Sequence, residues 1–119
     1  LAGLVTYSNA AKQKFLGVRA DTLAAHGAVS EPVAREMAEG ARRQTEADYA
    51  LSVTGIAGPG GATPGKPAGT VFIGLAGPSG TVVERNFNPY DRITFKQVTA
   101  QQALELLRRT LVSPDAGKS

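Results

Sequence analysis

The chain has 119 residues, a length typical of one domain, and 42% of them are apolar, which excludes a generic disordered protein. It has no cysteine and one histidine, so disulfide frameworks, thiolate zinc sites and multi-histidine metal clusters are excluded. Its net charge of +3 is spread over scattered Lys and Arg, and no apolar run approaches the roughly 20 residues of a membrane span. We therefore expect neither a nucleic-acid nor a membrane partner.

The first elements alternate between apolar and mixed segments. Residues 1–8 are apolar and end in a β-branched and aromatic run, which predicts a buried strand. Residues 9–16 predict a short helix that ends at Gly17 in a left-handed conformation, and residues 18–27 allow a further turn anchored by Leu23. Because the chain opens on Leu1, inside an apolar stretch, we expect its natural start to lie upstream.

A helix start follows at Ser30. A hydroxyl cap, an acid in the first turn and a proline whose missing N–H costs nothing stand together in Ser30, Glu31 and Pro32. The helix should run to about Thr45 and bury one face, which carries Val33, Met37, Ala38 and Ala41.

Three strands and a long helix complete the predicted fold. Residues 48–58 and 68–77 predict strands, and the turn Gly77–Gly80 joins the second to a strand at 81–87, which makes an antiparallel hairpin. Asp91 should cap a helix whose apolar stripe is formed by Ala100, Ala103, Leu104, Leu107 and Leu111. We expect an α/β fold with helices on both faces of a mixed sheet, and a polar tail at 113–119.

The segment from Gly55 to Gly80 has the strongest compositional bias. It holds nine of the 14 glycines and four of the seven prolines. Repeated glycine lets backbone N–H groups converge on a phosphate or a carboxylate, whereas the alternative is a surface loop that only needs turn residues. The segment is neither a P-loop nor a dinucleotide fingerprint, because no Gly-Lys-Ser/Thr follows and a strand comes next.

A second candidate lies at the first helix start. If Ser8 caps that helix, Tyr7 and Lys12 occupy the two positions that normally pack as an apolar staple. A neighbouring ammonium lowers the pKa of a phenol from about 10 and so favours a usable base. The alternative is a half-buried tyrosine under a solvated lysine stem.

The other polar residues carry weaker signals. His26 reads as a loop residue bonded to backbone, and Ser52 as structural. Ser30 is explained by capping, although its hydroxyl and the helix N-terminus also suit an anion. No metal site can be assembled.

Several segments together resemble the C-terminal domain of the CinA (competence/damage-inducible) family: TYSNAAK, HGAVSEPVAREMAEGAR, TGIAGPGG, KPAGTV and YDR. The resemblance covers 1–112 as one domain and implies a three-layer α/β/α sandwich. It also implies amidase activity that converts nicotinamide mononucleotide to nicotinate mononucleotide and ammonia, without metal or cofactor.

The family's catalytic group is a serine assisted by a tyrosine and a lysine, and the last two match Tyr7 and Lys12. The serine stands in a Glu-Ser-x-Thr-Gly-Gly segment that would precede Leu1, so we expect it upstream; without it this fragment would be inactive. Lys96 stands where we expect arginine. The resemblance and the glycine loop together suggest a substrate site formed by Ser8, Asn9, Ser30, Thr54, Gly55, Ala57, Gly58, Gly60, Gly61, Arg92 and Lys96.

Two other classes of function stay open. One is a non-catalytic nucleotide- or phosphate-binding or regulatory module, and the other is an interaction domain fused to a molybdopterin-binding-like domain, as in some family members. The resemblance suggests a homo-oligomer, and the lack of cysteine and of an export signal suggests a cytoplasmic protein.

Overall fold

The computed structural model describes residues 2–3, 17–56 and 65–112. Along these residues the elements are β1 (Ala2–Gly3), α2 (Ala20–His26), α3 (Glu31–Thr45), β2 (Ala50–Gly55), β3 (Thr70–Gly77), β4 (Gly80–Phe87) and α4 (Arg92–Val112). The helix predicted at 9–16 and the tail at 113–119 lie outside the described residues. The further turn predicted at 18–27 is the helix α2, and Gly17 before it has a φ of 70°, as predicted.

The described strands form one sheet in the order β1-β2-β3-β4. β1 runs parallel to β2, with Ala2 opposite Ala50, whereas β3 and β4 are antiparallel to their neighbours. Gly77 pairs with Gly80 across a two-residue turn, which confirms the predicted hairpin. The sheet is therefore mixed, as expected.

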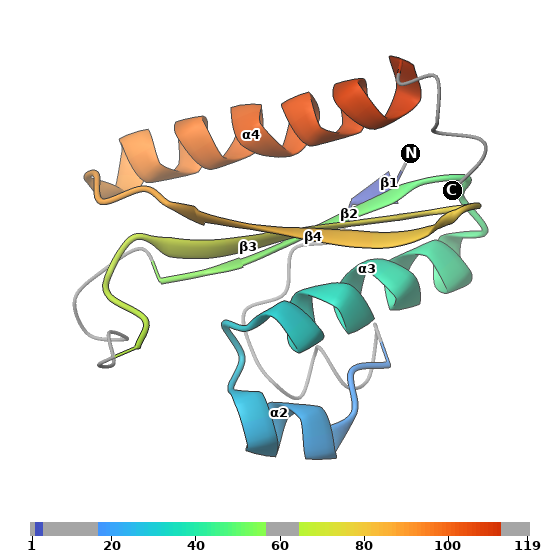
Figure 1. Ribbon diagram of the computed structural model, residues 1–119, viewed down its shortest axis with the longest axis horizontal. Coiled ribbons are helices and arrows are strands. Elements are labelled where there is room, and N and C mark those ends of the chain that lie inside the picture. Colours follow the sequence, from blue (N-terminus) through green and yellow to red (C-terminus); the bar gives the residue numbers. More distant parts are fainter. Residues whose placement is uncertain (1, 4–16, 57–64, 113–119) are drawn as a thin grey trace.

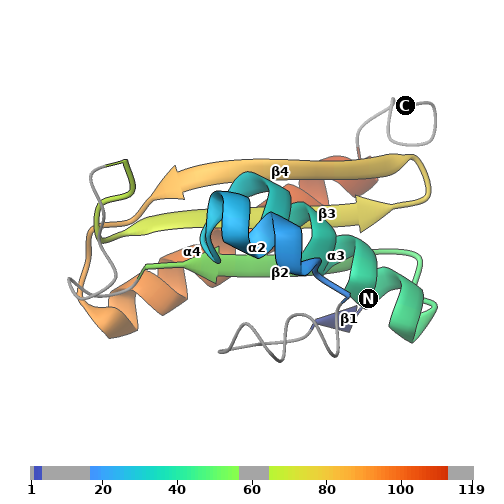
Figure 2. The ribbon, with the colours of Figure 1, turned by 90° about the horizontal axis from the view of Figure 1, so that it is seen from below.

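Helices lie on both sides of this sheet. Figure 1 shows α4 along one face and α3 along the other, with α2 outside α3. The view from below shows α2 and α3 in front of the strands and α4 behind them (Figure 2). The predicted α/β fold with two covered faces is confirmed.

Each face of the sheet has its own core. On the α3 side the cluster comprises Val18, Leu23, Val33, Met37, Ala41 and Ala50. On the α4 side it comprises Val71, Ile73, Leu75, Phe95, Ala103 and Leu106. β3 is buried on both faces because both helices cover it.

α3 approaches the sheet closely because two small residues lie at the crossing. A Cβ added to Gly74 would lie 2.7 Å from the carbonyl oxygen of Ala34, so only glycine fits there. Beside it, the Ser52 hydroxyl donates a hydrogen bond of 2.7 Å to the same oxygen. The structural role expected for Ser52 is confirmed.

The apolar stripe predicted for α4 is wrong in part. Ala103 is buried and Leu107 is half-buried, but Ala100, Leu104 and Leu111 are exposed. The helix instead buries four side chains: Phe95, Thr99, Ala103 and Leu106. Thr99 lies inward because its hydroxyl accepts a hydrogen bond of 3.0 Å from the side-chain amide of the buried Asn88.

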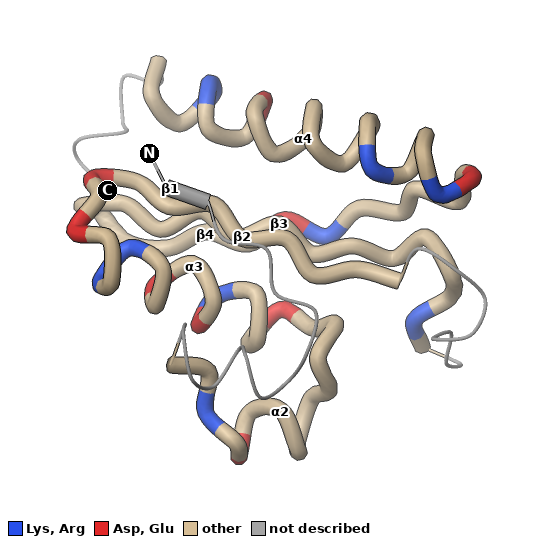
Figure 3. The backbone as a smooth tube through the Cα atoms, turned by 180° about the vertical axis from the view of Figure 1, so that it is seen from behind, with Lys and Arg blue, Asp and Glu red and all other residues tan. Residues whose placement is uncertain are grey.

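The charged residues are mixed in sign. Figure 3 shows Lys and Arg interspersed with Asp and Glu along the helices and connecting segments. Several form exposed ion pairs, among them Arg35–Glu31 on α3 and Arg109 of α4 with Glu84 of β4. None of the described helices is long and apolar enough to cross a membrane.

Candidate functional site

The described candidate residues gather at one end of the sheet. β2 ends there at Gly55, β3 begins there at Thr70, and α3 begins nearby at Glu31. Because β1 is parallel to β2, it points toward the same end. Tyr7, Ser8, Asn9 and Lys12 follow β1 in the chain, but they lie outside the described residues.

Ser30 is the N-cap of α3, as predicted. Its side chain is 4% exposed, and its Oγ accepts a hydrogen bond of 3.4 Å from the N–H of Val33. The same hydroxyl donates a bond of 2.8 Å to the carbonyl oxygen of Gly27. Since a serine hydroxyl has one proton and two lone pairs, the described residues leave one acceptor position of Ser30 for a ligand.

Thr54 lies next to this cap, on the same face of the sheet. Its side chain is buried, and its Oγ1 donates a hydrogen bond of 2.8 Å to the carbonyl oxygen of Ala28. Ala28 and Gly27 belong to the connection between α2 and α3. Ser30 and Thr54 are therefore brought together around that connection.

The base of the glycine-rich loop closes directly beyond β2. The N–H of Ile56 donates to the carbonyl of Thr70, and the N–H of Gly69 donates to the carbonyl of Ile56, at 2.9 and 2.6 Å. The Thr70 hydroxyl donates to the carbonyl of Pro67 at 2.6 Å. The loop residues Ala57, Gly58, Gly60 and Gly61 lie outside the described residues, but both of the loop's ends are held at this edge.

Two cations hold the second stem of the loop, residues 65–67. Lys66 Nζ donates a bond of 2.8 Å to the carbonyl oxygen of His26, at the end of α2. Arg85 Nη2 donates a bond of 3.1 Å to the carbonyl oxygen of Gly65, and the Arg85 guanidinium lies 5.5 Å from the centre of the Phe72 ring. We call Lys66, Phe72 and Arg85 the stem clamp.

The stem clamp is not among the residues predicted from the sequence. Its acceptors are backbone carbonyls, which no residue type signals. One signal was available, however: counting back from the predicted turn at Gly77–Gly80 pairs Phe72 with Arg85, as the sheet confirms. The same register places Thr54 opposite Phe72, so Thr54, Phe72 and Arg85 form one row across three strands.

Arg92 and Lys96 lie on the other side of the sheet. Both are exposed on the first turns of α4, and within the described part of the chain neither makes a hydrogen bond or an ion pair. Phe95 between them packs under the end of β2, because a Cβ at Gly55 would lie 3.0 Å from its Cζ. The sheet thus separates these two cations from Ser30 and Thr54.

α4 begins at an acidic cap beside these cations. Asp91 Oδ1 accepts hydrogen bonds from the N–H groups of Ile93 and Thr94, at 3.1 and 3.0 Å, which confirms the predicted cap. The bonds from the N–H and the hydroxyl of Thr94, and to a lesser extent the bond from Ile93, lower the pKa of the Asp91 carboxyl below its usual 3.8. Among the described residues no group of carboxylates and histidine is placed to hold a metal ion.

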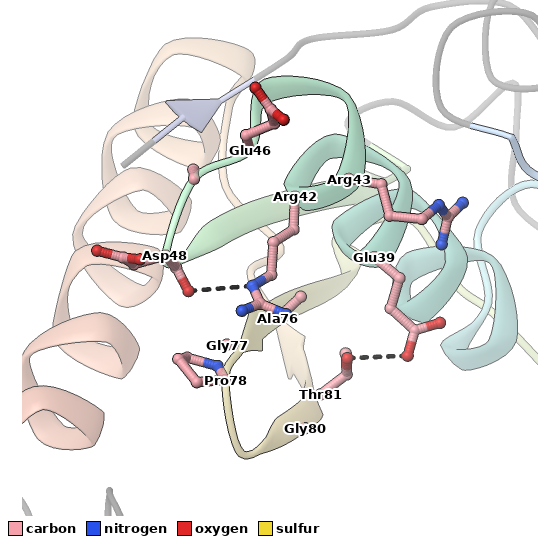
Figure 4. A pocket seen from close by; sticks show the side chains of 11 residues that line it. Glu39, Arg42, Arg43, Glu46, Asp48, Ala76, Gly77, Pro78, Gly80 and Thr81 are labelled. Atoms are coloured by element: carbon pink, nitrogen blue, oxygen red, sulfur yellow. Dashed lines mark hydrogen bonds between the residues drawn. The ribbon is translucent and has the colours of Figure 1, made fainter.

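A depression of about 550 Å³ lies at the opposite end of the sheet (Figure 4). Two of its charged side chains have partners: Glu39 accepts from the Thr81 hydroxyl at 2.9 Å, and Arg42 Nε donates to the carbonyl of Asp48 at 3.1 Å. In Figure 4 the carboxylate of Asp48 points away from Arg42. None of the predicted site residues that the structure describes lines this depression, so we place the candidate site at the loop end.

The fold and this edge define an α/β domain in which the two ends of a glycine-rich segment lie at the same end of the sheet as a capped helix. The family model for the CinA C-terminal domain matches residues 1–111. The chain therefore belongs to the CinA C-terminal domain family.

Curated and solved relatives agree with this assignment. The chain is 55% identical over 109 residues to a CinA-like protein of Anaeromyxobacter sp. (strain K), which covers 92% of this chain and 27% of that protein. A CinA-like protein of Thermotoga neapolitana is 49% identical over 111 residues. The chain thus spans about a quarter of the length of these curated relatives.

Among solved structures, the competence damage-inducible protein A of Klebsiella pneumoniae superposes with a TM-score of 0.86 at 38% identity, covering 92% of this chain and 68% of that one. A competence/damage-inducible protein of Agrobacterium tumefaciens gives a TM-score of 0.81 at 39% identity. At these identities the likeness extends beyond the fold to the sequence.

Proposed function

We propose that this domain is the catalytic part of an amidohydrolase that converts nicotinamide mononucleotide and water to nicotinate mononucleotide and ammonia. One observation carries the proposal. The parallel pairing of β1 with β2 points both strands toward the end of the sheet where Ser30 and Thr54 lie. In the sequence, the candidate bases Tyr7 and Lys12 follow β1 and the glycine-rich loop follows β2; beside the serine expected upstream, these are the groups that the proposed amide hydrolysis uses.

The proposed mechanism has two steps. A serine of the family's Glu-Ser-x-Thr-Gly-Gly segment attacks the carboxamide carbon, and its proton passes to the Tyr7–Lys12 pair. The pair then protonates the leaving nitrogen, so that ammonia departs and an acyl ester remains. Water hydrolyses the ester, giving the carboxylate and the free serine.

The glycine-rich loop has one of two roles in this proposal. Its backbone N–H groups either stabilise the oxyanion that forms at the carbonyl or hold the 5′-phosphate of the nucleotide. We favour substrate binding by Thr54, Gly55, Ala57, Gly58, Gly60 and Gly61, with Ser8, Asn9 and Ser30 nearby. Arg92 and Lys96 lie across the sheet from Ser30 and Thr54; neither pairs with a described acidic residue, and we keep both as candidates for a phosphate contact.

The decisive experiment measures ammonia release from nicotinamide mononucleotide by the protein in its full natural length. Tyr7→Phe and Lys12→Ala should each lower the rate at least a hundredfold, roughly the smallest contribution of a positioned acid or base. The melting temperature should change little, because each substitution removes one polar group. Arg108→Met is a matched control, since Arg108 is exposed on α4 and pairs with Glu105.

The outcomes separate the two main functions. Turnover by the wild type that is retained in both variants would contradict the assignment of Tyr7 and Lys12. Binding of the nucleotide without any release of ammonia would favour the non-catalytic nucleotide- or phosphate-binding module instead. If the protein neither binds the nucleotide nor releases ammonia, the remaining hypothesis is that it is an interaction domain.

Two further expectations belong to this proposal. The enzyme would be cytoplasmic. It would also form a homo-oligomer, and light scattering of the purified protein tests this oligomeric state. It would use no cofactor, so dialysis against a chelator should leave the rate unchanged.

A further inference from the structure

Arg85 differs from most other described arginines in its partners. Arg19, Arg35, Arg108 and Arg109 each form an ion pair with a glutamate. In the part of the chain that the structure describes, Arg85 has no carboxylate partner and contacts the ring of Phe72 and the carbonyl of Gly65. The hydrogen bond that Arg85 donates therefore goes to the loop stem and not to a described carboxylate.

The chemistry of a guanidinium suits this position. Its flat, delocalised cation can lie over an aromatic face while its N–H groups donate at its rim. Phe72 is 6% exposed in the middle of the sheet, so the ring is a fixed platform. Because its guanidinium contacts both the Phe72 ring and the Gly65 carbonyl, Arg85 holds Gly65 at a fixed place relative to the sheet.

The next residue completes the connection. Lys66 follows Gly65, and its Nζ bonds the carbonyl of His26 at the end of α2. The loop stem is held to β4 by one cation and to the α2–α3 connection by another. Thr54 holds the same connection to β2 through Ala28, so the contacts form a closed ring around the edge where Ser30 lies.

We propose that Arg85 is a positioning residue for nucleotide binding: it fixes the loop stem at residues 65–67 relative to Ser30 and Thr54. The identity of the nucleotide in this inference rests on the proposed function, whereas the contacts of Arg85 do not. Removing the guanidinium should loosen the stem and weaken binding. It should not slow the chemical step, because the contacts that Arg85 makes with described residues are to the Phe72 ring and the Gly65 carbonyl, neither of which is a proposed reacting group.

The first test measures geometry without turnover. Arg85→Met keeps an apolar chain over Phe72 and removes the donor and the charge, and Arg108→Met is the matched control on α4. Hydrogen exchange of the Gly69 and Thr70 amides, which donate to the carbonyls of Ile56 and Pro67, should be about tenfold faster in Arg85→Met. Exchange equal to that of the control would overturn the inference.

The second test separates binding from chemistry. With nicotinamide mononucleotide, Arg85→Met should raise KM about tenfold and leave kcat within about twofold, and Arg85→Lys should recover part of the loss because it keeps a charge and a donor. A fall in kcat at unchanged KM would overturn the positioning role. Arg85→Lys also serves if the methionine variant does not fold, as judged by circular dichroism.

The two proposals fail in different ways. If the wild type releases no ammonia, the proposed function fails, and the exchange experiment still decides the role of Arg85. If the wild type is active and Arg85→Met behaves like Arg108→Met in both tests, only the role of Arg85 fails.

Discussion

Three buried hydroxyls on the α3 side of the sheet all donate to backbone carbonyls. Ser30 donates to Gly27, Thr54 to Ala28 and Ser52 to Ala34. A hydroxyl has a single proton, and here each proton is already donated to a carbonyl. While these bonds persist, each hydroxyl can therefore only accept a hydrogen bond from a ligand. If Ser30 and Thr54 contact the nucleotide, they therefore accept from its donors.

The cap of α4 predicts how stability depends on pH. The bonds that Asp91 accepts favour its ionised form, so its pKa is lower in the folded than in the unfolded protein. Its contribution is fully present above the unfolded value, near 3.8, and is lost as the pH falls through the lowered folded value. Asp91→Ala should lower the melting temperature at pH 7, and the difference from wild type should shrink toward pH 2.

Thermal unfolding of the two proteins at a series of pH values checks this. Glu105→Gln is a useful comparison, because its carboxyl also has a lowered pKa, caused chiefly by Arg108, in an exposed pair. A constant difference between wild type and Asp91→Ala from pH 7 to pH 2 would contradict the assigned cause.

Caps could be predicted at single residues because they depend on local sequence. Ser30 with Pro32, and Asp91 before α4, were both recognised from their neighbours. The stem clamp could not be read in this way, because Arg85 and Gly65 meet only once β3 and β4 are paired. The contacts of Tyr7 and Lys12 stay predictions.

At the scale of elements, α4 shows where pattern reading fails. The predicted stripe took the aliphatic residues as the buried face. The helix is instead oriented by Phe95, which packs under Gly55, and by Thr99, which bonds Asn88. An aromatic side chain and a buried polar contact therefore determine how α4 is rotated about its own axis. In this orientation Leu104 and Leu111 are exposed.

This rotation predicts contrasting effects of two leucine substitutions. Leu106 is 8% exposed and Leu104 is 58% exposed. Leu106→Ala should lower the free energy of unfolding by about 2–5 kcal/mol because it leaves a cavity. Leu104→Ala should change it by about 0.5 kcal/mol or less. Urea unfolding of both variants tests this, and a larger loss in Leu104→Ala than in Leu106→Ala would show that α4 is rotated as the sequence pattern predicts.

At the scale of the whole molecule, the sheet separates two cores. Met37 belongs to the cluster on the α3 side and Leu106 to the cluster on the α4 side. They share no partner in either cluster, and the backbone of the sheet lies between them. Substitutions in the two cores should therefore act independently.

A double-mutant cycle measures this independence. Met37→Ala and Leu106→Ala should each cost about 2–5 kcal/mol, and their combined loss should equal the sum within about 0.5 kcal/mol. The single and double variants are compared by urea unfolding, with unchanged m values as the control for two-state behaviour. A coupling energy well above that limit would mean that the two layers form one packing unit.

The overall fold could be predicted further than the site. The apolar strand segments, the hairpin turn and two helix caps, all read from contiguous residues, predict the antiparallel hairpin and the helices of the α/β fold. The parallel pairing of β1 with β2 and the closed ring around Ser30 are contacts between distant segments. Such contacts depend on how the layers pack, which local patterns do not encode.

The placement of Phe72 gives the molecule a natural spectroscopic probe. The chain has four phenylalanines and no tryptophan, and among the described ones Phe72 and Phe95 lie close to the end of β2, on opposite faces of the sheet. Biosynthetic labelling with a fluorinated analogue would give each ring a separate fluorine resonance. The resonance of Phe72, whose ring lies under a cation that also holds the loop stem, would then report occupancy of the site during a titration.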